Sequence, residues 1–157
     1  MPHSDDSLFF PLVSNFRRLY AKALIARLEP YKVRPGYIEI LNRLWEQDNV
    51  TQKQLHAKLA IEQATLSNSL KRMERDGLIE RQRSPKDRRL CHIILTDTAI
   101  RLEPTVKSAI EDVQSVVNEG LTINDRRYFN RILRQMTEHI ETDIDDPCLV
   151  LLDEVAD

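Results

Sequence analysis

The sequence predicts a mainly α-helical fold with one small β-hairpin, because three patterns follow one another in the middle of the chain. Leu66, Leu70 and Met73 recur at helical spacing and define one buried stripe on a helix. Asp76-Gly77 then ends the helical pattern, since glycine is the usual residue for a left-handed position after a helix. Two short aliphatic runs, separated by a turn signal at residues 85–87, follow as a pair of strands.

A shorter helix is expected just before the helix that carries Leu66, Leu70 and Met73. Thr51 followed by Gln54 is the pattern of a capping box at a helix start. Val50 and Leu55 belong to the inner face that we expect for this helix. Helix, tight turn, helix and hairpin, in that order, make a winged helix–turn–helix, which we place at residues 34–96 as the DNA-binding domain.

The second of these helices, here called the reading helix, has small and amide side chains near its start and cations further along. That order is typical of a helix that enters the DNA major groove by its N-terminal end. Asn68 is expected to pair with an adenine edge, and Thr65 or Ala64 to touch a thymine methyl group. The alternative is an ordinary solvated helix face. The DNA contacts predicted here are Gln63, Ala64, Thr65, Ser67, Asn68, Lys71, Arg72 and Arg75 of the reading helix, with Thr51 and Gln52 of the preceding helix on the DNA backbone.

Positive charge is concentrated in the same region. Residues 71–89 contain eight Lys or Arg and four Asp or Glu, a local charge of +4 in a chain whose formal net charge is -2. Residues 138–157 contain eight acids and no Lys or Arg. Such clustering of cations marks a nucleic-acid footprint better than net charge does. The wing residues predicted to contact DNA are Arg81, Arg83, Lys86, Asp87, Arg88 and Arg89.

Residues 51–96, TQKQLHAKLAIEQATLSNSLKRMERDGLIERQRSPKDRRLCHIILT, resemble the core of the MarR family of bacterial transcriptional regulators. The most specific element is Asp87-Arg88-Arg89 followed by the Ile94-Leu95-Thr96 close, which is similar to the family's wing signature. The resemblance implies that Arg89 enters the minor groove and that Asp87 holds its side chain. A narrow minor groove attracts an inserted arginine through its enhanced negative potential. The alternative for this pair is an exposed ion pair that adds little stability.

The flanking segments, 1–33 and 97–145, are expected to be helices. We predict a first helix at about residues 7–28, ended by Pro30, and a second helix that begins at Pro35. A long helix should start at Thr96 or Asp97, kink at Pro104 and stop at Gly120. Thr122 and Asp125 resemble a capping box for the last helix, and residues 146–157 form an acidic tail with no assigned structure.

The apolar stripes of these outer helices are too broad for one small core. The resemblance to the MarR family implies that the two ends interleave in a homodimer. A dimer would place two reading helices roughly 34 Å apart, on a near-palindromic operator. The alternative is that all the stripes fold onto one monomeric core.

A small aromatic or lipophilic effector is a further expectation, because the family commonly binds such compounds between the dimer helices and the winged core. An arginine beside aromatic rings would suit a carboxylate on a ring. The alternative is that Tyr37 and Trp45 are core residues and that Arg17 faces solvent. The effector-lining residues predicted here are Arg17, Tyr20, Tyr31, Tyr37, Trp45 and Ile100.

Other classes have less support. The chain lacks the motifs G-x-x-x-x-G-K, H-E-x-x-H and C-x-x-C, its four histidines are scattered, and we expect neither an enzyme nor a metal site or cofactor. A thiol-based sensor is an alternative, but the two cysteines, Cys91 and Cys148, lie outside the first helix where some relatives have theirs. A winged module that binds protein instead of DNA is another. No apolar run approaches a membrane span, so we expect a cytoplasmic protein. The sequence therefore predicts a homodimeric DNA-binding repressor that responds to a ligand.

Overall fold

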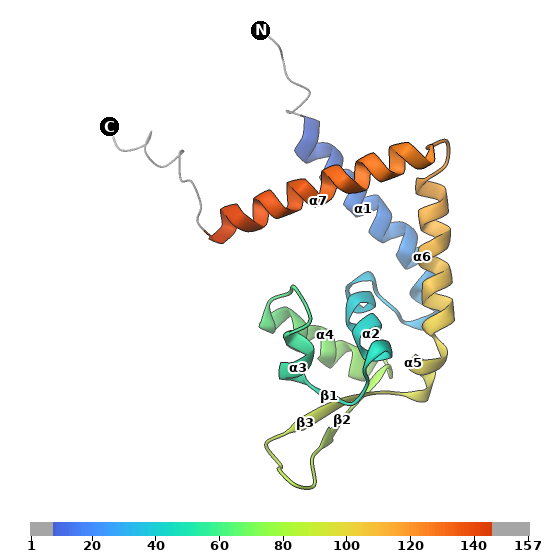
Figure 1. Cartoon of the computed structure of the whole chain (residues 1–157). Helices are drawn as coiled ribbons and strands as arrows, with labels where there is room; N and C mark the ends of the chain where they lie inside the picture. Colours follow the sequence, from blue (N-terminus) through green and yellow to red (C-terminus); the bar gives the residue numbers. More distant parts are fainter. Residues whose placement is uncertain (1–7, 146–157) are drawn as a thin grey trace. The chain divides into compact units, whose positions relative to one another are not determined.

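The computed structural model describes residues 8–145 and divides the chain into two compact units that meet between Ser115 and Val116 (Figure 1). The predicted acidic tail, with Cys148, lies outside the described residues. The elements of the first unit are α1 (Phe9–Leu28), the 3-10 turn η2 (Glu29–Tyr31), α2 (Pro35–Glu46), β1 (Val50–Thr51), α3 (Gln52–His56), α4 (Gln63–Arg75), β2 (Ile79–Arg83), β3 (Cys91–Leu95), α5 (Asp97–Arg101) and α6 (Glu103–Val117), the last of which runs into the second unit. The second unit contains α7 (Ile123–Asp145). The predicted fold class, mainly helical with a small β-wing, is confirmed.

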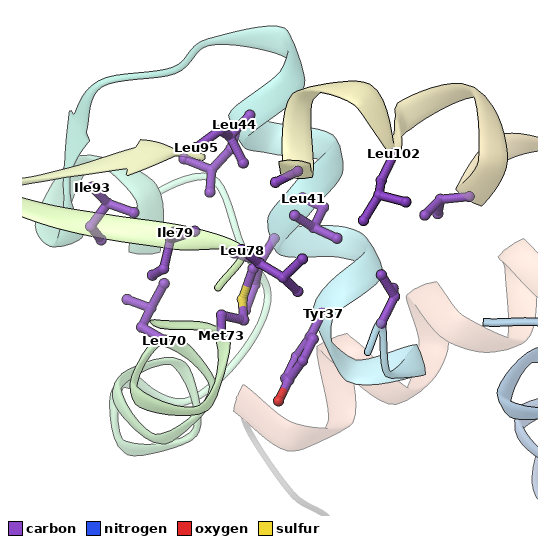
Figure 2. Packing of buried hydrophobic residues seen from close by; sticks show 14 of the residues in the cluster. Tyr37, Leu41, Leu44, Leu70, Met73, Leu78, Ile79, Ile93, Leu95 and Leu102 are labelled. Carbon is purple, nitrogen blue, oxygen red and sulfur yellow. The ribbon is translucent and has the colours of Figure 1, made fainter. Parts of the chain in front are cut away.

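The core of the first unit is built around α4, the reading helix. Leu66, Leu70 and Met73 are completely buried, so the predicted apolar stripe is confirmed. Figure 2 shows Leu70 and Met73 beside Leu78 and Ile79 of the segment that leads into the wing. Burying one such side chain contributes roughly 1.5–3 kcal/mol, so this stripe fixes which face of α4 points outward.

The sheet has three antiparallel strands in the order β1-β3-β2, not the two that the sequence predicted. β2 and β3 pair in register from Ile79 with Leu95 to Arg83 with Cys91. Val50 pairs with Ile93 and is buried. The prediction that Val50 forms part of a helix is therefore wrong, because this β-branched residue completes the sheet instead.

The predicted capping box is confirmed at the residue after Val50. The backbone N–H of Gln54 donates to Thr51 Oγ1 at 3.2 Å, and the Thr51 N–H donates to Gln54 Oε1 at 2.9 Å. Because Thr51 closes β1 and also caps α3, the sheet and the first helix of the helix–turn–helix share one residue.

The other helix boundaries mostly follow their sequence signals. Pro35 occupies the first position of α2, as predicted. α1 begins at Phe9, two residues later than predicted. The single long helix kinked at Pro104 is wrong, because the structure ends α5 at Arg101 and starts α6 at Glu103. Pro104 then lies in the first turn of α6, where a backbone N–H would have no acceptor within the helix.

Two helices expose long apolar surfaces. In α1 only Leu24 and Leu28 are buried, and in α7 no residue is. The large exposed apolar side chains of these helices are Phe9, Phe10, Leu12, Val13, Phe16, Leu19 and Ile25 of α1 and Ile123, Tyr128, Phe129, Ile132, Leu133, Ile140 and Ile144 of α7. No helix within residues 8–145 has both the length and the apolarity to cross a bilayer.

The start of α7 has the predicted cap. The Asp125 N–H donates to Thr122 Oγ1 at 3.1 Å, and the Thr122 N–H donates to Asp125 Oδ2 at 2.9 Å. Hydrogen bonds from the Thr122 hydroxyl and backbone lower the pKa of Asp125. Gly120, just before this cap, has φ of 75°, the left-handed conformation expected at its predicted helix stop.

Candidate nucleic-acid interface

The outer face of α4 is polar and open to solvent. Ser67 is half-buried, and every other residue predicted on this helix to contact DNA is exposed. The buried stripe on the opposite side holds the helix against the core, so this polar face keeps a fixed outward orientation. Rigid presentation of this kind is what base reading in the major groove requires.

Ser67 is half-buried because it contacts the preceding helix. Gln52 Nε2 donates a hydrogen bond to Ser67 Oγ at 2.6 Å. Gln52 was predicted only as a contact to the DNA backbone, and the sequence contained no signal for this link. The bond joins the two helices of the helix–turn–helix through side chains that lie on their polar faces.

The wing tip is shaped by main-chain hydrogen bonds. The Ser84 N–H donates to the Leu90 carbonyl at 2.9 Å, and the Leu90 N–H donates to the Asp87 carbonyl at 3.0 Å. The Asp87 carboxylate accepts from the backbone N–H of Arg89 at 2.9 Å. Among the described residues, the Asp87 carboxylate thus contacts the backbone of Arg89 and not, as the resemblance implies, its side chain. Asp87 therefore stabilises the turn, and Arg89 is exposed.

Arg81 behaves differently from the other wing cations. Its Nε lies 3.4 Å from Glu74 Oε2 of α4, and its side chain is only 28% exposed. Nε and Nη2 are buried without a hydrogen-bond partner among the described residues. Arg81 therefore ties the wing to α4, while the cations that remain exposed on the wing are Arg83, Lys86, Arg88 and Arg89.

A polar cluster stands at the C-terminal end of α4. The Tyr37 hydroxyl donates to Asp76 Oδ2 at 3.0 Å, and Arg75 Nε lies 3.1 Å from Asp76 Oδ1. Burial raises the pKa of Tyr37, and so does the hydrogen bond to Asp76. Partial desolvation acts to raise the pKa of Asp76, but the hydrogen bonds from Arg75 and Tyr37 outweigh it and lower that pKa.

The predicted effector-lining residues are spread over several environments. Tyr37 belongs to the hydrophobic core, which corrects the prediction that it lines a pocket. Trp45 is half-buried, and its Nε1 donates to the Ala99 carbonyl at 3.0 Å. Tyr20 is half-buried with its ring 5.7 Å from that of Phe16, whereas Arg17, Tyr31 and Ile100 are exposed.

A surface hollow of about 370 Å³ lies between α2 and α6. Of the six predicted effector residues it is lined by Trp45 alone. Its remaining lining consists of Asn42, Glu46, Glu103, Lys107, Ile110 and Glu111.

The described part of the chain contains one free cysteine and no cluster of metal-ligating side chains. Cys91 is a free, half-buried thiol at the start of β3, opposite Arg83. No group of three or more His, Cys, Asp or Glu side chains within residues 8–145 is arranged to hold a metal ion.

Comparison with known families identifies this architecture. The MarR family model matches residues 35–91, from the start of α2 to the first residue of β3. The winged core of the chain thus matches the MarR family. The matched span contains the whole of α4 and the wing tip with Asp87 and Arg89, so the residues that carry the exposed cations are those that define the family match.

Similar proteins match a longer part of the chain than the family model does. The HTH-type transcriptional regulator MgrA of Staphylococcus aureus is 35% identical over 94 residues, which cover 60% of this chain and 63% of MgrA. The chain thus matches less than two thirds of the length of that curated relative. A MarR transcriptional regulator from Methanosarcina mazei Go1 is similar in structure, with a TM-score of 0.71, 25% identity and coverage of 87% of this chain and 98% of its own.

A second solved structure that resembles this chain is reduced AbfR bound to DNA. It has a TM-score of 0.64 and 27% identity, and it covers 86% of this chain and 92% of its own. Both structural matches are far longer than the family-model match, so the similarity of fold includes helices outside the winged core.

Proposed function

We propose that this protein is a sequence-specific, duplex-DNA-binding transcriptional regulator of the MarR family that acts as a homodimer. One observation carries the proposal: seven Lys or Arg side chains of α4 and the wing are exposed around one polar helix face that the core holds in place. Cations so grouped neutralise phosphates, which supplies most of the affinity for duplex DNA. The likeness to AbfR, solved bound to DNA, supports the same function.

The proposed contacts fall into two groups, those that read base edges and those that orient the protein on the DNA backbone. Asn68, exposed on the middle of α4, would pair with an adenine edge in the major groove, and Ala64 and Thr65 would meet thymine methyl groups. Lys71 and Arg72 would contact phosphates, which orient the protein and carry no sequence information. Arg89, exposed at the wing tip, would enter the minor groove.

The homodimer accounts for the apolar surface of α1 and α7. Phe10 of α1 is 79% exposed and Ile144 of α7 is 69% exposed, and both belong to longer apolar stripes. Monomeric proteins rarely leave contiguous patches of this extent in water. A second copy of the chain would cover them and set two reading helices about one DNA turn apart.

Regulation by a small aromatic or lipophilic effector is the finer part of the proposal. An effector would release DNA only if it bound one spacing of the reading helices more tightly than another. Thermal unfolding in the presence of a panel of aromatic acids tests this, with Trp45→Phe as the matched variant for the hollow between α2 and α6. Absence of any thermal shift, together with unchanged DNA affinity, would refute it.

Selection of genomic DNA fragments on the purified protein at moderate salt tests the central proposal. Enrichment of an inverted repeat is the expected result, because two identical reading helices related by a twofold axis read the same half-site twice. Retention of bulk DNA without enrichment, lost as salt rises, would overturn sequence-specific reading and favour a module that binds another protein.

A further inference from the structure

We propose that Tyr37 and Asp76 are positioning residues that aim the guanidinium of Arg75 at the DNA backbone. The inference rests on the proposed DNA-binding function and adds two residues to it, neither of which was predicted to take part in DNA binding. Neither Tyr37 nor Asp76 would contact DNA itself. Their effect on binding passes through Arg75 alone.

The three side chains form a path from the core to the surface. Tyr37 is 2% exposed, the Asp76 side chain 13% and the Arg75 side chain 61%. Figure 2 shows Tyr37 at the margin of the buried cluster, with its hydroxyl pointing away from the aliphatic side chains. The Asp76 carboxylate uses one oxygen for each neighbour, Oδ2 for the Tyr37 hydroxyl and Oδ1 for Arg75 Nε.

This arrangement leaves the phosphate-binding part of Arg75 unobstructed. A guanidinium has five N–H donors in a fixed plane, of which Nε–H is one. With Nε held by Asp76 at 3.1 Å, the two Nη groups are the free end of the fork. That end matches the paired oxygens of a phosphate.

The anchor also reduces the entropy cost of binding. An arginine side chain has many rotamers, and a free side chain loses this conformational entropy when it engages a phosphate. Tyr37 is fixed by its core neighbours, and it in turn fixes the orientation of the Asp76 carboxylate. Arg75 is therefore partly ordered before DNA arrives, whereas Lys71 and Arg72 on the same helix make no hydrogen bond or ion pair through their side chains with any residue in the range 8–145.

The charge state of the cluster suits this role. The hydrogen bonds from Arg75 and Tyr37 hold the pKa of Asp76 low, and the hydrogen bond to Asp76 raises the pKa of Arg75. Arg34 adds a second positive charge near the carboxylate. Both members of the pair are therefore ionised at neutral pH, and Arg34 partly compensates the negative charge of Asp76.

A double-mutant cycle tests the inference. The dissociation constant for a selected duplex is measured for the unmodified protein, Tyr37→Phe, Arg75→Ala and the double variant, after thermal unfolding has shown that each is folded. Tyr37→Phe removes one hydroxyl and no charge, so it leaves the long-range electrostatics of the protein unchanged. We expect it to weaken binding about three- to tenfold alone and less than about twofold in the Arg75→Ala background.

Each outcome has a distinct meaning. Equal losses in both backgrounds would overturn the inference, because Tyr37 would then act on the placement of α4 as a whole. No loss in either background would also overturn it and leave Tyr37 as a core residue only. Failure of the unmodified protein to bind any duplex would instead refute the proposed function.

The Arg43–Glu46 pair of α2 supplies the matched control. Its Nη1–Oε2 distance is also 3.1 Å, but it lies outside the predicted DNA interface. Arg43→Gln, at the member of the pair that does not line the hollow between α2 and α6, should leave the dissociation constant within about twofold of the unmodified protein, as expected for a distant, independent site. A loss as large as that of Tyr37→Phe would mean that the assay responds to any disturbance of α2, which would overturn the assignment.

Discussion

Replacement of Arg89 by alanine tests the wing most directly. The Arg89 side chain is exposed, and its backbone N–H is fixed by Asp87, so its removal should leave the turn intact. The expected result is weaker binding with a shallower dependence on salt, because one cation per protomer no longer releases counterions from the DNA.

The magnitude follows from the number of charges removed. The proposed dimer would lose two cations, and each contributes about 0.9 to the slope of log affinity against log salt concentration, so the slope should flatten by about 1.8. Between 50 and 200 mM salt, a fourfold change, the affinity of the unmodified protein should therefore fall about 12-fold further than that of the variant.

Fluorescence anisotropy of a labelled duplex, titrated at four or five salt concentrations, gives both affinity and slope. Arg101→Ala is the matched control, because Arg101 is an exposed arginine of α5 outside the predicted interface. Equal flattening in the two variants would show a general charge effect and no specific wing contact. An unchanged slope and affinity for Arg89→Ala would mean that the wing does not engage DNA.

Three further predictions concern the reading helix. Asn68→Ala should weaken the binding free energy by roughly 1–3 kcal/mol through one base pair and by little through the others. Affinities for operator variants with single base changes test this, and an equal loss on all sequences would identify a contact to the DNA backbone. Leu70→Ala should lower the free energy of unfolding in denaturant by about 2–5 kcal/mol, because Leu70 is completely buried, whereas exposed Lys71→Ala should change it by less than about 0.5 kcal/mol. Because the pKa of Asp76 is lower in the folded protein, its ionised form stabilises the fold above the unfolded value of about 3.9, and this contribution is lost as the pH falls through the lowered pKa. Asp76→Asn should therefore show a smaller loss of stability than the unmodified protein below pH of about 4, and equal acid sensitivity of the two would contradict this reasoning.

The sequence predicted local features better than long-range pairings. The Thr51–Gln54 capping box, the Pro35 helix start and the stripe at Leu66 and Leu70 each depend on residues within one or two helical turns, and the structure has them all. Val50 was assigned to a helix because its strand partner, Ile93, is distant in sequence and periodicity contains no trace of the pair.

Pro104 illustrates a different limit. A proline inside a helical pattern can either kink the helix or stand in the first turn of a new one, and sequence alone does not choose. Here α5 ends at Arg101 and α6 begins at Glu103, so Pro104 stands in the first turn of a new helix.

The candidate site was predicted as a set of residues but not as a set of contacts. The exposure of Asn68 and Arg89 follows from the apolar pattern and the turn chemistry around them. The bond from Gln52 to Ser67 and the ion pair of Arg81 with Glu74 require a tertiary fold that brings separate elements together. The hydroxyl of Tyr37 is the clearest case, since its hydrogen-bond partner, Asp76, is 39 residues away in the sequence.

The strand order β1-β3-β2 has a consequence for how the chain folds. The central strand, β3, is the last of the three to leave the ribosome, so neither β1 nor β2 has a neighbour until residues 91–95 have been made. Pairing of β2 with β3 closes a short loop, whereas pairing of β1 with β3 must close one of about 40 residues, which costs more chain entropy. The hairpin should therefore form before β1 docks, so the strand that leads into α3 joins the wing only after β2 and β3 have paired.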